Sequence, residues 1–112
     1  MSRPKPPPRS LLFVPTLQES WVAKAIRFKP DGVILDLEDS VPPAEKPRCR
    51  LAVGGQIRTL AQAGVLPLVR INGLGEGGFD DLEHVVGDAL YALMVPKVGT
   101  AAQILELCDR LS

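Results

Sequence analysis

The sequence contains few of the residues that build metal centres and reactive thiol sites. Among 112 residues there is one histidine, His84, and there are two cysteines, Cys49 and Cys108. One histidine and two widely separated cysteines cannot supply the ligand spacing of a zinc site within one copy of the chain. No Cys-x-x-Cys motif is present, so we expect two reduced, unpaired thiols, as in a cytoplasmic protein.

An excess of charge, aromatic residues and long apolar runs are also lacking. Thirteen basic and thirteen acidic residues cancel, and three Phe, one Trp and one Tyr are the only aromatic residues. The sequence therefore gives no sign of a basic or base-stacking surface, and we expect no nucleic-acid partner. Every apolar run is far shorter than the ~18 residues of a membrane span. We expect no membrane contact, no signal peptide and a cytoplasmic location.

What is present is the composition of one globular domain. The chain is 46% hydrophobic and 23% charged, which is ordinary for such a domain. Residues 1–9, MSRPKPPPR, are basic and rich in proline, and we interpret them as a disordered lead. Residues 10–112 show no further change of composition and are predicted to form a single domain.

Short apolar runs alternate with helical periodicity through residues 10–112. Strands are predicted at 10–15, 33–37, 66–71 and 89–95, and helices at 17–28, 44–64, 79–86 and after a cap at Thr100. This alternation predicts an α/β fold with a parallel sheet and right-handed crossovers. We expect Trp21 to anchor the first helix, and Ile104, Leu105, Cys108 and Leu111 to line the buried side of the last. Four such units are half of a (β/α)₈ barrel.

The stretch GVILDLEDSVPP, residues 32–43, is an apolar strand that becomes acidic at its end. Strand alternation places Asp36 and Glu38 on one face, with Asp39 directly after them. Carboxylates at the tip of a core strand require a cation or hydrogen-bond donors. From these residues alone two interpretations stay open: the acidic tip lines a site, or it caps the next helix and pairs with local bases.

Polar side chains follow the other predicted strands as well. They are Thr16 after the first strand, Arg70 and Asn72 after the third, and Lys97 after the fourth. The carboxyl ends of parallel strands share one edge of the sheet, where α/β proteins place their sites. If the second and third strands are neighbours, Arg70 reaches Asp36 or Glu38 and either ties the strands together or binds a substrate carboxylate. Lys97 is either a solvated rim residue or a ligand contact.

The glycine-rich segment GLGEGG, residues 73–78, lies between the third strand and an acidic helix start. It lacks the Gly-Lys-Ser/Thr ending of a phosphate-binding loop. We interpret it as a mobile turn.

Four ordered motifs resemble a known family. RSLLFVP (9–15), GVILDLEDSV followed by PAEK (32–46), LVRING (68–73) and MVPKV (94–98) are similar to early motifs of the citrate lyase β subunit and HpcH/HpaI aldolase family. The resemblance implies a TIM barrel that cleaves or forms a carbon–carbon bond in acyl-CoA or oxo-acid substrates, such as citryl-CoA or malyl-CoA. It also implies Mg²⁺ that polarises the substrate oxygens.

By position, Arg70 matches the family's arginine that holds the substrate carboxylate. The resemblance makes Asp36, Glu38 and Asp39 neighbours of the metal rather than its ligands. Asn72 and Lys97, which follow strands at the same edge, are predicted to line the pocket. The family's direct metal ligands, a Glu and an Asp, lie on later strands, so we expect none in this chain. We therefore expect a lyase fragment or divergent member that is inactive alone, and that forms a homo-oligomer or pairs with a missing C-terminal half.

Two alternatives to an enzyme stay open. The first is a non-catalytic half-barrel remnant or assembly module. The second is a receiver-like signalling domain, which PDGVILDLEDSVP (30–42) also resembles. A receiver needs an acidic pair after its first strand, where this chain has Pro15, Thr16 and Leu17.

Overall fold

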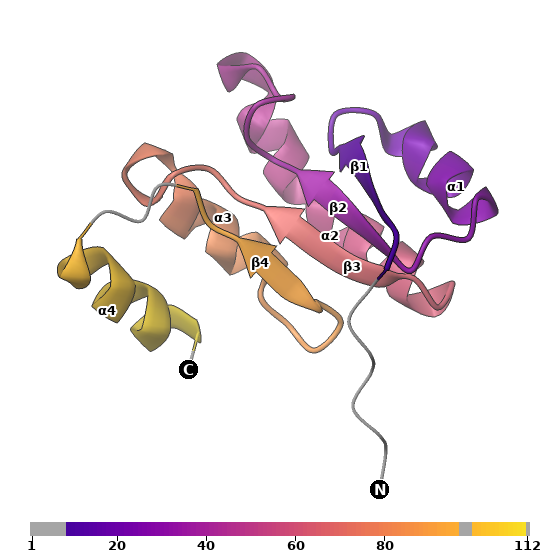
Figure 1. The fold of residues 1–112 in the computed structure, drawn as a ribbon. Coiled ribbons are helices and arrows are strands. Elements are labelled where there is room, and N and C mark those ends of the chain that lie inside the picture. The colour runs from indigo at the N-terminus through magenta and orange to yellow at the C-terminus, as the bar shows by residue number, and fades with distance from the viewer. Residues whose placement is uncertain (1–8, 97–99, 112) are drawn as a thin grey trace, which may run out of the picture.

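A computed structural model describes residues 9–96 and 100–111 of the chain, as four strands alternating with four helices (Figure 1). In chain order the elements are β1 (Leu11–Pro15), α1 (Glu19–Arg27), β2 (Gly32–Asp36), α2 (Lys46–Gln62), β3 (Leu66–Arg70), α3 (Gly78–Val85), β4 (Ala92–Met94) and α4 (Ala101–Leu111). Two 3₁₀ turns, η1 (Pro43–Glu45) and η2 (Leu74–Glu76), precede α2 and α3. The predicted order of strands and helices is confirmed.

The four strands form one parallel sheet in the order β1-β2-β3-β4. Each strand pairs with the next strand of the chain, and the register places Asp36 opposite Arg70. The predicted parallel α/β fold is therefore shown. A sheet that follows chain order, as barrel strands do, differs from the 2-1-3-4-5 order of a doubly wound receiver-like fold.

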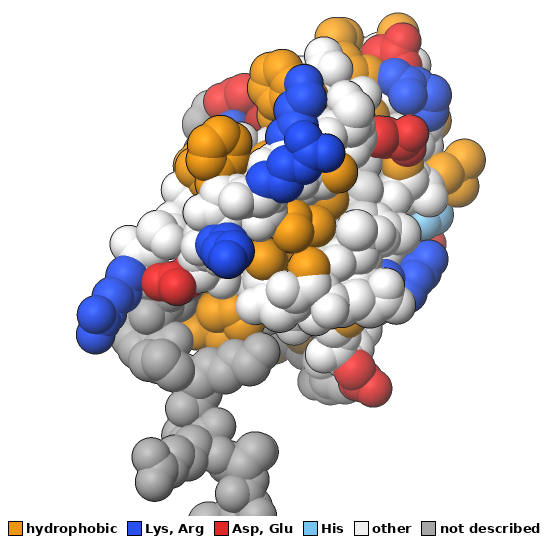
Figure 2. Space-filling view, turned by 90° about the vertical axis from the view of Figure 1, so that its right-hand side faces the viewer, with side chains coloured by type: hydrophobic (Ala, Val, Ile, Leu, Met, Phe, Trp, Pro, Cys, Tyr) orange, Lys and Arg blue, Asp and Glu red, His pale blue; other side chains and the backbone are white. Residues whose placement is uncertain are grey.

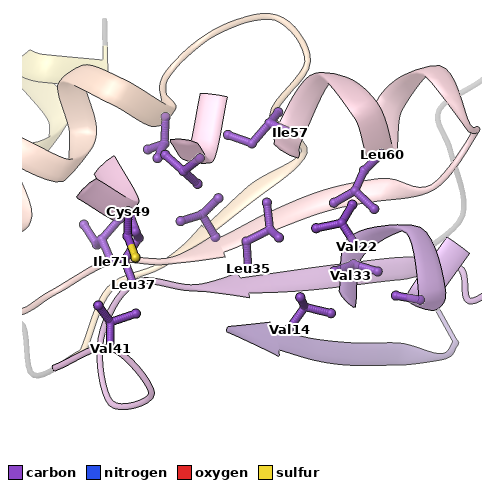
Figure 3. Close-up of a cluster of buried hydrophobic side chains, with 14 of the residues drawn as sticks. Val14, Val22, Val33, Leu35, Leu37, Val41, Cys49, Ile57, Leu60 and Ile71 are labelled. Carbon is purple, nitrogen blue, oxygen red and sulfur yellow. The ribbon is translucent and has the colours of Figure 1, made fainter. Parts of the chain in front are cut away.

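One face of the sheet is covered by helices and holds the main core. The strand residues in this core come from alternate positions, such as Val33, Leu35 and Val69, all of them 0% exposed. They contact buried side chains of α1, α2 and α3, among them Val22 and Leu60 (Figure 3). We call this the covered face of the sheet.

The opposite face carries the other alternate positions of the same strands. Ile34, Leu66 and Leu68 form a small separate cluster there, with Ala92 packed beside them. Register places Phe13 opposite Ile34 on this face, and the Phe13 side chain is 53% exposed. No helix residue within the described ranges belongs to this cluster. We call this the open face; in a closed barrel it would be the interior.

The prediction that Trp21 anchors the first helix was wrong. Trp21 is 45% exposed, because α1 turns Val22 and Ala25 toward the sheet and Trp21 lies about 100° round the helix from Val22. The side of α1 and β1 seen in Figure 2 accordingly shows apolar side chains among lysines and arginines.

The last helix packs only through its edge. Its predicted buried residues are exposed: Ile104 by 50%, Leu105 by 70% and Leu111 by 45%, and Cys108 is exposed as well. Leu107 is the α4 residue that packs against the core cluster. The predicted cap is confirmed, since the Gln103 N–H donates to Thr100 Oγ1 at 3.1 Å.

β4 is shorter than predicted at its start. The Leu90 N–H donates to the Gly87 oxygen in a turn, so the sheet is joined only from Tyr91, whose N–H donates to the Pro67 oxygen at 2.8 Å. Cys49 and Cys108 form no disulfide within the described residues. Within the described ranges, no helix combines the length and the apolar character that crossing a membrane requires. The predicted disordered lead lies outside the described residues except for Arg9, whose N–H donates to Asp31 Oδ2 at 2.7 Å.

Candidate functional site

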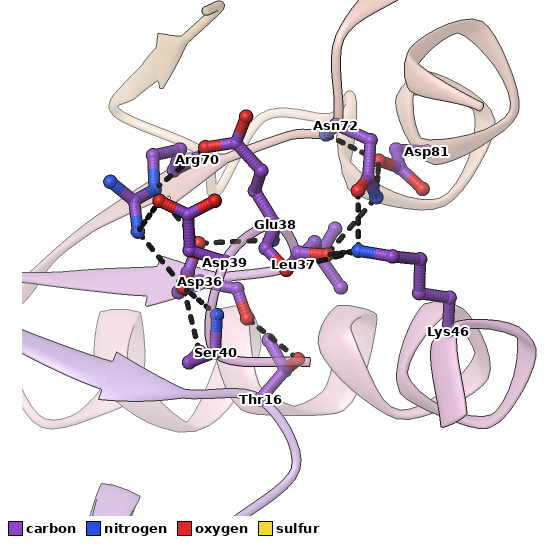
Figure 4. Close-up of polar contacts among 10 residues, drawn as sticks. All are labelled: Thr16, Asp36, Leu37, Glu38, Asp39, Ser40, Lys46, Arg70, Asn72 and Asp81. Carbon is purple, nitrogen blue, oxygen red and sulfur yellow. Dashed lines mark hydrogen bonds and ion pairs between the residues drawn. The ribbon is translucent and has the colours of Figure 1, made fainter. Parts of the chain in front are cut away.

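Asp36 and Arg70 form the centre of a polar cluster at the carboxyl edge of the open face. Arg70 Nε donates to Asp36 Oδ1 at 2.9 Å, and Arg70 Nη2 donates to Asp36 Oδ2 at 3.0 Å (Figure 4). The pairing arises because β2 and β3 are adjacent and place these two residues opposite one another. The predicted contact is confirmed, in the two-bond geometry that gives arginine–carboxylate pairs their strength.

Asp36 is held as a carboxylate although it is only 2% exposed. Burial alone would raise its pKa, but hydrogen bonds from Arg70, from Ser40 and from the Glu38 amide lower it. The Glu38 N–H donates to Oδ1 at 3.0 Å, and the Ser40 N–H and hydroxyl donate to Oδ2 at 2.9 and 2.6 Å. These donors together outweigh burial, so the pKa of Asp36 lies well below its usual range.

The same pair fixes the charge of Arg70. Its hydrogen bond to Asp36 raises the pKa of the guanidinium, and partial burial opposes this only in part. The Phe13 ring lies beneath the guanidinium, with its centroid 5.1 Å from Arg70 Cζ. Arg70 is therefore a permanent cation held from two sides.

Glu38 and Asp39 surround the guanidinium at longer range. Glu38 Oε1 lies 3.5 Å from Arg70 Nε, and Asp39 Oδ2 lies 3.9 Å from Arg70 Nη2. Side-chain exposure rises from 3% at Asp36 to 22% at Glu38 and 79% at Asp39. Asp36 is thus a structural partner of Arg70, whereas the outer two carboxylates can meet a ligand. Of the second interpretation, the helix-capping part is wrong, because α2 has no side-chain hydrogen bond at its N-cap, whereas the pairing with a base is confirmed at Arg70.

A second polar network, beside the first, contains residues to which the sequence analysis gave no role. Lys46 Nζ donates to the Leu37 oxygen, the Glu38 oxygen and Asn72 Oδ1 at 3.0, 3.0 and 2.6 Å. Asp81, 0% exposed, accepts from the Asn72 N–H at 2.8 Å and from Asn72 Nδ2 at 2.7 Å. Asn72 was predicted in the pocket; its side chain lies between Lys46 and Asp81 (Figure 4).

Arg50 completes this network. The sequence contained signals for two other members of the network, Lys46 and Asp81. Arg50 Nε donates to Asp81 Oδ1 at 2.6 Å. Lys46 belongs to the PAEK motif, and Asp81 belongs to the acidic first turn of α3. A carboxylate in a first helical turn is, however, adequately explained by the helix dipole, so nothing in the pattern required it to be buried.

The glycine-rich segment is a close-packed turn that supports this network. Gly77 has φ +100°, and a Cβ there would lie 2.8 Å from Arg50 Nη2. A Cβ on Gly78 would clash with the Asn72 carbonyl oxygen. These glycines let the start of α3 approach β3 closely enough for Asp81 to reach Asn72.

Thr16 ties β1 to the same edge from a fully buried position. Its hydroxyl donates to the Asp36 carbonyl oxygen at 2.8 Å. Gln56 Nε2 donates to the backbone carbonyl oxygen of Thr16 at 3.0 Å. Lys97, the remaining predicted pocket residue, lies outside the described residues.

The carboxylates at this edge of the sheet do not form a set of direct ligands for Mg²⁺. Among residues 9–96 and 100–111, no cluster of three His, Cys, Asp or Glu side chains could hold a metal ion. Both oxygens of Asp36 are occupied by Arg70, Ser40 and the Glu38 amide. Only Glu38 and Asp39 remain, and Mg²⁺ demands near-octahedral oxygen geometry.

Comparison with known proteins identifies the family. Residues 9–111 match the model of the HpcH/HpaI aldolase/citrate lyase family. The chain belongs to this family. A citrate lyase subunit beta of Haemophilus influenzae is 33% identical over 100 residues, which cover 88% of this chain and 34% of that protein. An L-malyl-CoA/beta-methylmalyl-CoA lyase of Cereibacter sphaeroides is 39% identical over 105 residues, which cover 90% and 33%.

Solved structures of this family share the fold. Protein CitE of Mycobacterium tuberculosis, in complex with magnesium, acetoacetate and coenzyme A, superposes with a TM-score of 0.67 at 38% identity, covering 89% of this chain and 36% of that one. The citrate lyase beta subunit of the same organism, with oxaloacetate and magnesium, gives the same TM-score and identity and is covered to 43%. The chain spans about a third of the length of the curated relatives it matches.

Proposed function

We propose that this chain forms the β2–β3 corner of the substrate site of a carbon–carbon lyase, and that Arg70 binds a carboxylate of an acyl-CoA or oxo-acid substrate. The observation that carries this is the Arg70–Asp36 pair at the carboxyl edge of the open face. Asp36 takes two of the five guanidinium N–H groups. The remaining three make no hydrogen bond within the described residues, and the side chain is 24% exposed. Arg70 is therefore fixed on one side and accessible on the other.

The charges at this edge bear on the cofactor. One guanidinium faces three carboxylates, so an anionic oxo acid approaching Arg70 also meets Glu38 and Asp39. A further cation would offset that repulsion, and related CitE structures contain magnesium. We propose that Mg²⁺ is the cofactor, held by ligands outside the described residues, with Glu38 and Asp39 as neighbours. Such an ion would act as a Lewis acid on the substrate oxygens.

We propose that the 112-residue chain alone does not turn over acyl-CoA substrates. Its described residues offer no direct ligand set for the ion, and losing ~4 kcal/mol of transition-state stabilisation lowers a rate about a thousandfold. Activity would then require the rest of a barrel, supplied by a C-terminal family fragment or by assembly into an oligomer. We also propose that Lys97 lines the substrate pocket and that the protein is cytoplasmic.

The decisive experiment measures binding of oxaloacetate, with and without Mg²⁺, by isothermal titration calorimetry. We expect Arg70→Ala to weaken binding at least tenfold, because a charge-assisted pair is lost. Arg70→Lys should recover part of it, since lysine keeps the charge but not the fork. Arg27→Ala, on the exposed side of α1, is the matched control. Binding that is indifferent to Arg70 would refute the assignment.

The alternative of an assembly module without chemistry is favoured by one observation, the exposed apolar residues of the open face. A cleavage assay with citryl-CoA and malyl-CoA separates the two functions. Cleavage by the chain mixed with a C-terminal family fragment, lost in Arg70→Ala, supports the lyase. Assembly with no oxo-acid binding supports the module. Cleavage by the chain alone would show that its own residues hold the metal.

A further inference from the structure

The segment after β2 is held by side chains rather than by the sheet. The Leu37 N–H still donates to the Arg70 carbonyl oxygen at 2.9 Å, but among the described residues no strand donates to the Leu37 or Glu38 carbonyl oxygens. The Leu37 oxygen instead accepts from Lys46 Nζ and Asn72 Nδ2, each at 3.0 Å, and the Glu38 oxygen accepts from Lys46 Nζ at 3.0 Å. One ammonium group therefore fixes two successive peptide units.

Lys46 has no donor left for a ligand. An ammonium has three N–H groups, and here three oxygens accept from it: those of Leu37, Glu38 and the Asn72 side chain. All three acceptors are uncharged, so their geometry is set by hydrogen bonding and not by an ion pair. This distinguishes Lys46 from Arg70, whose outer edge is accessible.

The third acceptor is itself rigidly placed. The Asn72 amide can present its oxygen to Lys46 only in one orientation, because its Nδ2 donates to both Asp81 and the Leu37 oxygen. Asp81 in turn accepts from Arg50 and is 0% exposed. The position of the Lys46 ammonium is thus determined together by α2, by Asn72 just after β3, and by α3.

Glu38 has both of its peptide groups fixed by this arrangement. Its N–H donates to Asp36 Oδ1, and its carbonyl oxygen accepts from Lys46. With the backbone held on both sides, the carboxylate lies 3.5 Å from Arg70 Nε. We propose that Lys46 is a positioning residue that fixes the Leu37–Glu38 segment and so holds the Glu38 carboxylate beside Arg70. The proposal rests on the proposed function in treating this edge as a ligand site.

Amide hydrogen exchange tests the structural part. The N–H groups of Glu38, Ser40 and Val41 all donate within this segment, to Asp36 and to the Glu38 oxygen. In Lys46→Met these three amides should exchange about tenfold faster, while amides of β2 and β3 keep their rates. Lys24→Met, on the exposed side of α1, should change nothing. Unchanged rates at the three amides, or equal acceleration throughout the sheet, would overturn the proposal.

Lys46→Gln, which keeps two donors, replaces the Met variant if that variant does not fold, and is judged by the same criteria.

A double-mutant cycle tests the link to Glu38. If Lys46 acts through Glu38, Lys46→Met should change the oxaloacetate dissociation constant, measured with Mg²⁺, several-fold in the wild-type background and not in Glu38→Gln. An equal change in both backgrounds would refute the link. If the wild-type chain binds no oxaloacetate but the exchange result holds, the proposed function fails and the positioning role stands. If binding occurs and neither measurement responds to Lys46, the positioning role fails alone.

Discussion

The two faces of the sheet are both apolar, yet they differ in what covers them. On the covered face Leu35 and Val69 are 0% exposed beneath the helices. On the open face Leu11 is 42% and Phe13 is 53% exposed, and the candidate site lies at the carboxyl edge of this same face. A barrel strand must be apolar on both faces because it separates an interior from a ring of helices. Within the described residues the helices cover one face of the sheet, and the candidate site lies at the edge of the other.

The two faces should differ most in how much stability is lost when a leucine is truncated to alanine. Leu35→Ala should lower the free energy of unfolding by about 3–4 kcal/mol, because it opens a cavity beneath α2. Leu11→Ala should lower it by about 1 kcal/mol, since 42% of that residue is already exposed and truncation leaves no closed cavity. Urea unfolding followed by circular dichroism measures both. Equal losses would show that the open face is covered in solution.

Breaking the Arg70–Asp36 pair should have the next largest effect on stability. Arg70→Ala leaves Asp36 buried without its cation and should cost about 2–3 kcal/mol, a value reduced because Arg70 is a quarter exposed. The double variant Arg70→Ala, Asp36→Ala should recover part of this loss, because the uncompensated carboxylate is then gone. Thermal melts of the single and double variants provide the check, and a double variant less stable than the single would contradict it.

Low pH should act on the same carboxylate. The pKa of Asp36 is depressed in the folded chain, so below about pH 4 the unfolded chain binds the proton first and stability falls. Asp36 should contribute about 2 kcal/mol of the loss between pH 5 and pH 2.5. Asp36→Asn should flatten this part of the profile relative to the wild type. A variant profile parallel to the wild type would show that other carboxylates cause the acid loss.

The comparison also shows how far the sequence could predict this molecule. The order of elements and the Asp36–Arg70 contact were predictable because strand tips in a parallel sheet meet at one edge, whatever surrounds them. The exposure of Trp21 was not, because the periodicity of α1 alone does not determine which of two adjacent apolar stripes meets the sheet. The exposed stripe of α4 illustrates the same limit: the pattern shows that Ile104 and Leu111 share a face, not that a surface lies opposite them.

The second network was missed for a different physical reason. Lys46 contacts carbonyl oxygens and Asn72, and backbone carbonyls are present at every position, so no residue pattern marks which of them a lysine will reach. Asp81 is buried by the close approach of Gly78 to Asn72, which depends on a turn whose glycines are equally compatible with a mobile loop. Contacts that depend on backbone geometry become visible only in three dimensions.

The smallest expected change in folding stability is at Phe13, on the open face, where assembly is the informative measurement. Burying the exposed half of apolar side chains such as Leu11 and Phe13 gains about 1 kcal/mol each, so the wild-type chain should associate, with a second copy or a C-terminal family fragment. Phe13→Ser should cost the monomer less than about 1 kcal/mol, mainly the stacking under Arg70, yet shift sedimentation velocity profiles toward monomer. Phe28→Ser, at a side chain 78% exposed at the end of α1, is the matched control. A wild-type chain that sediments as a single monomeric species with a cooperative melt would show that the open face needs no partner.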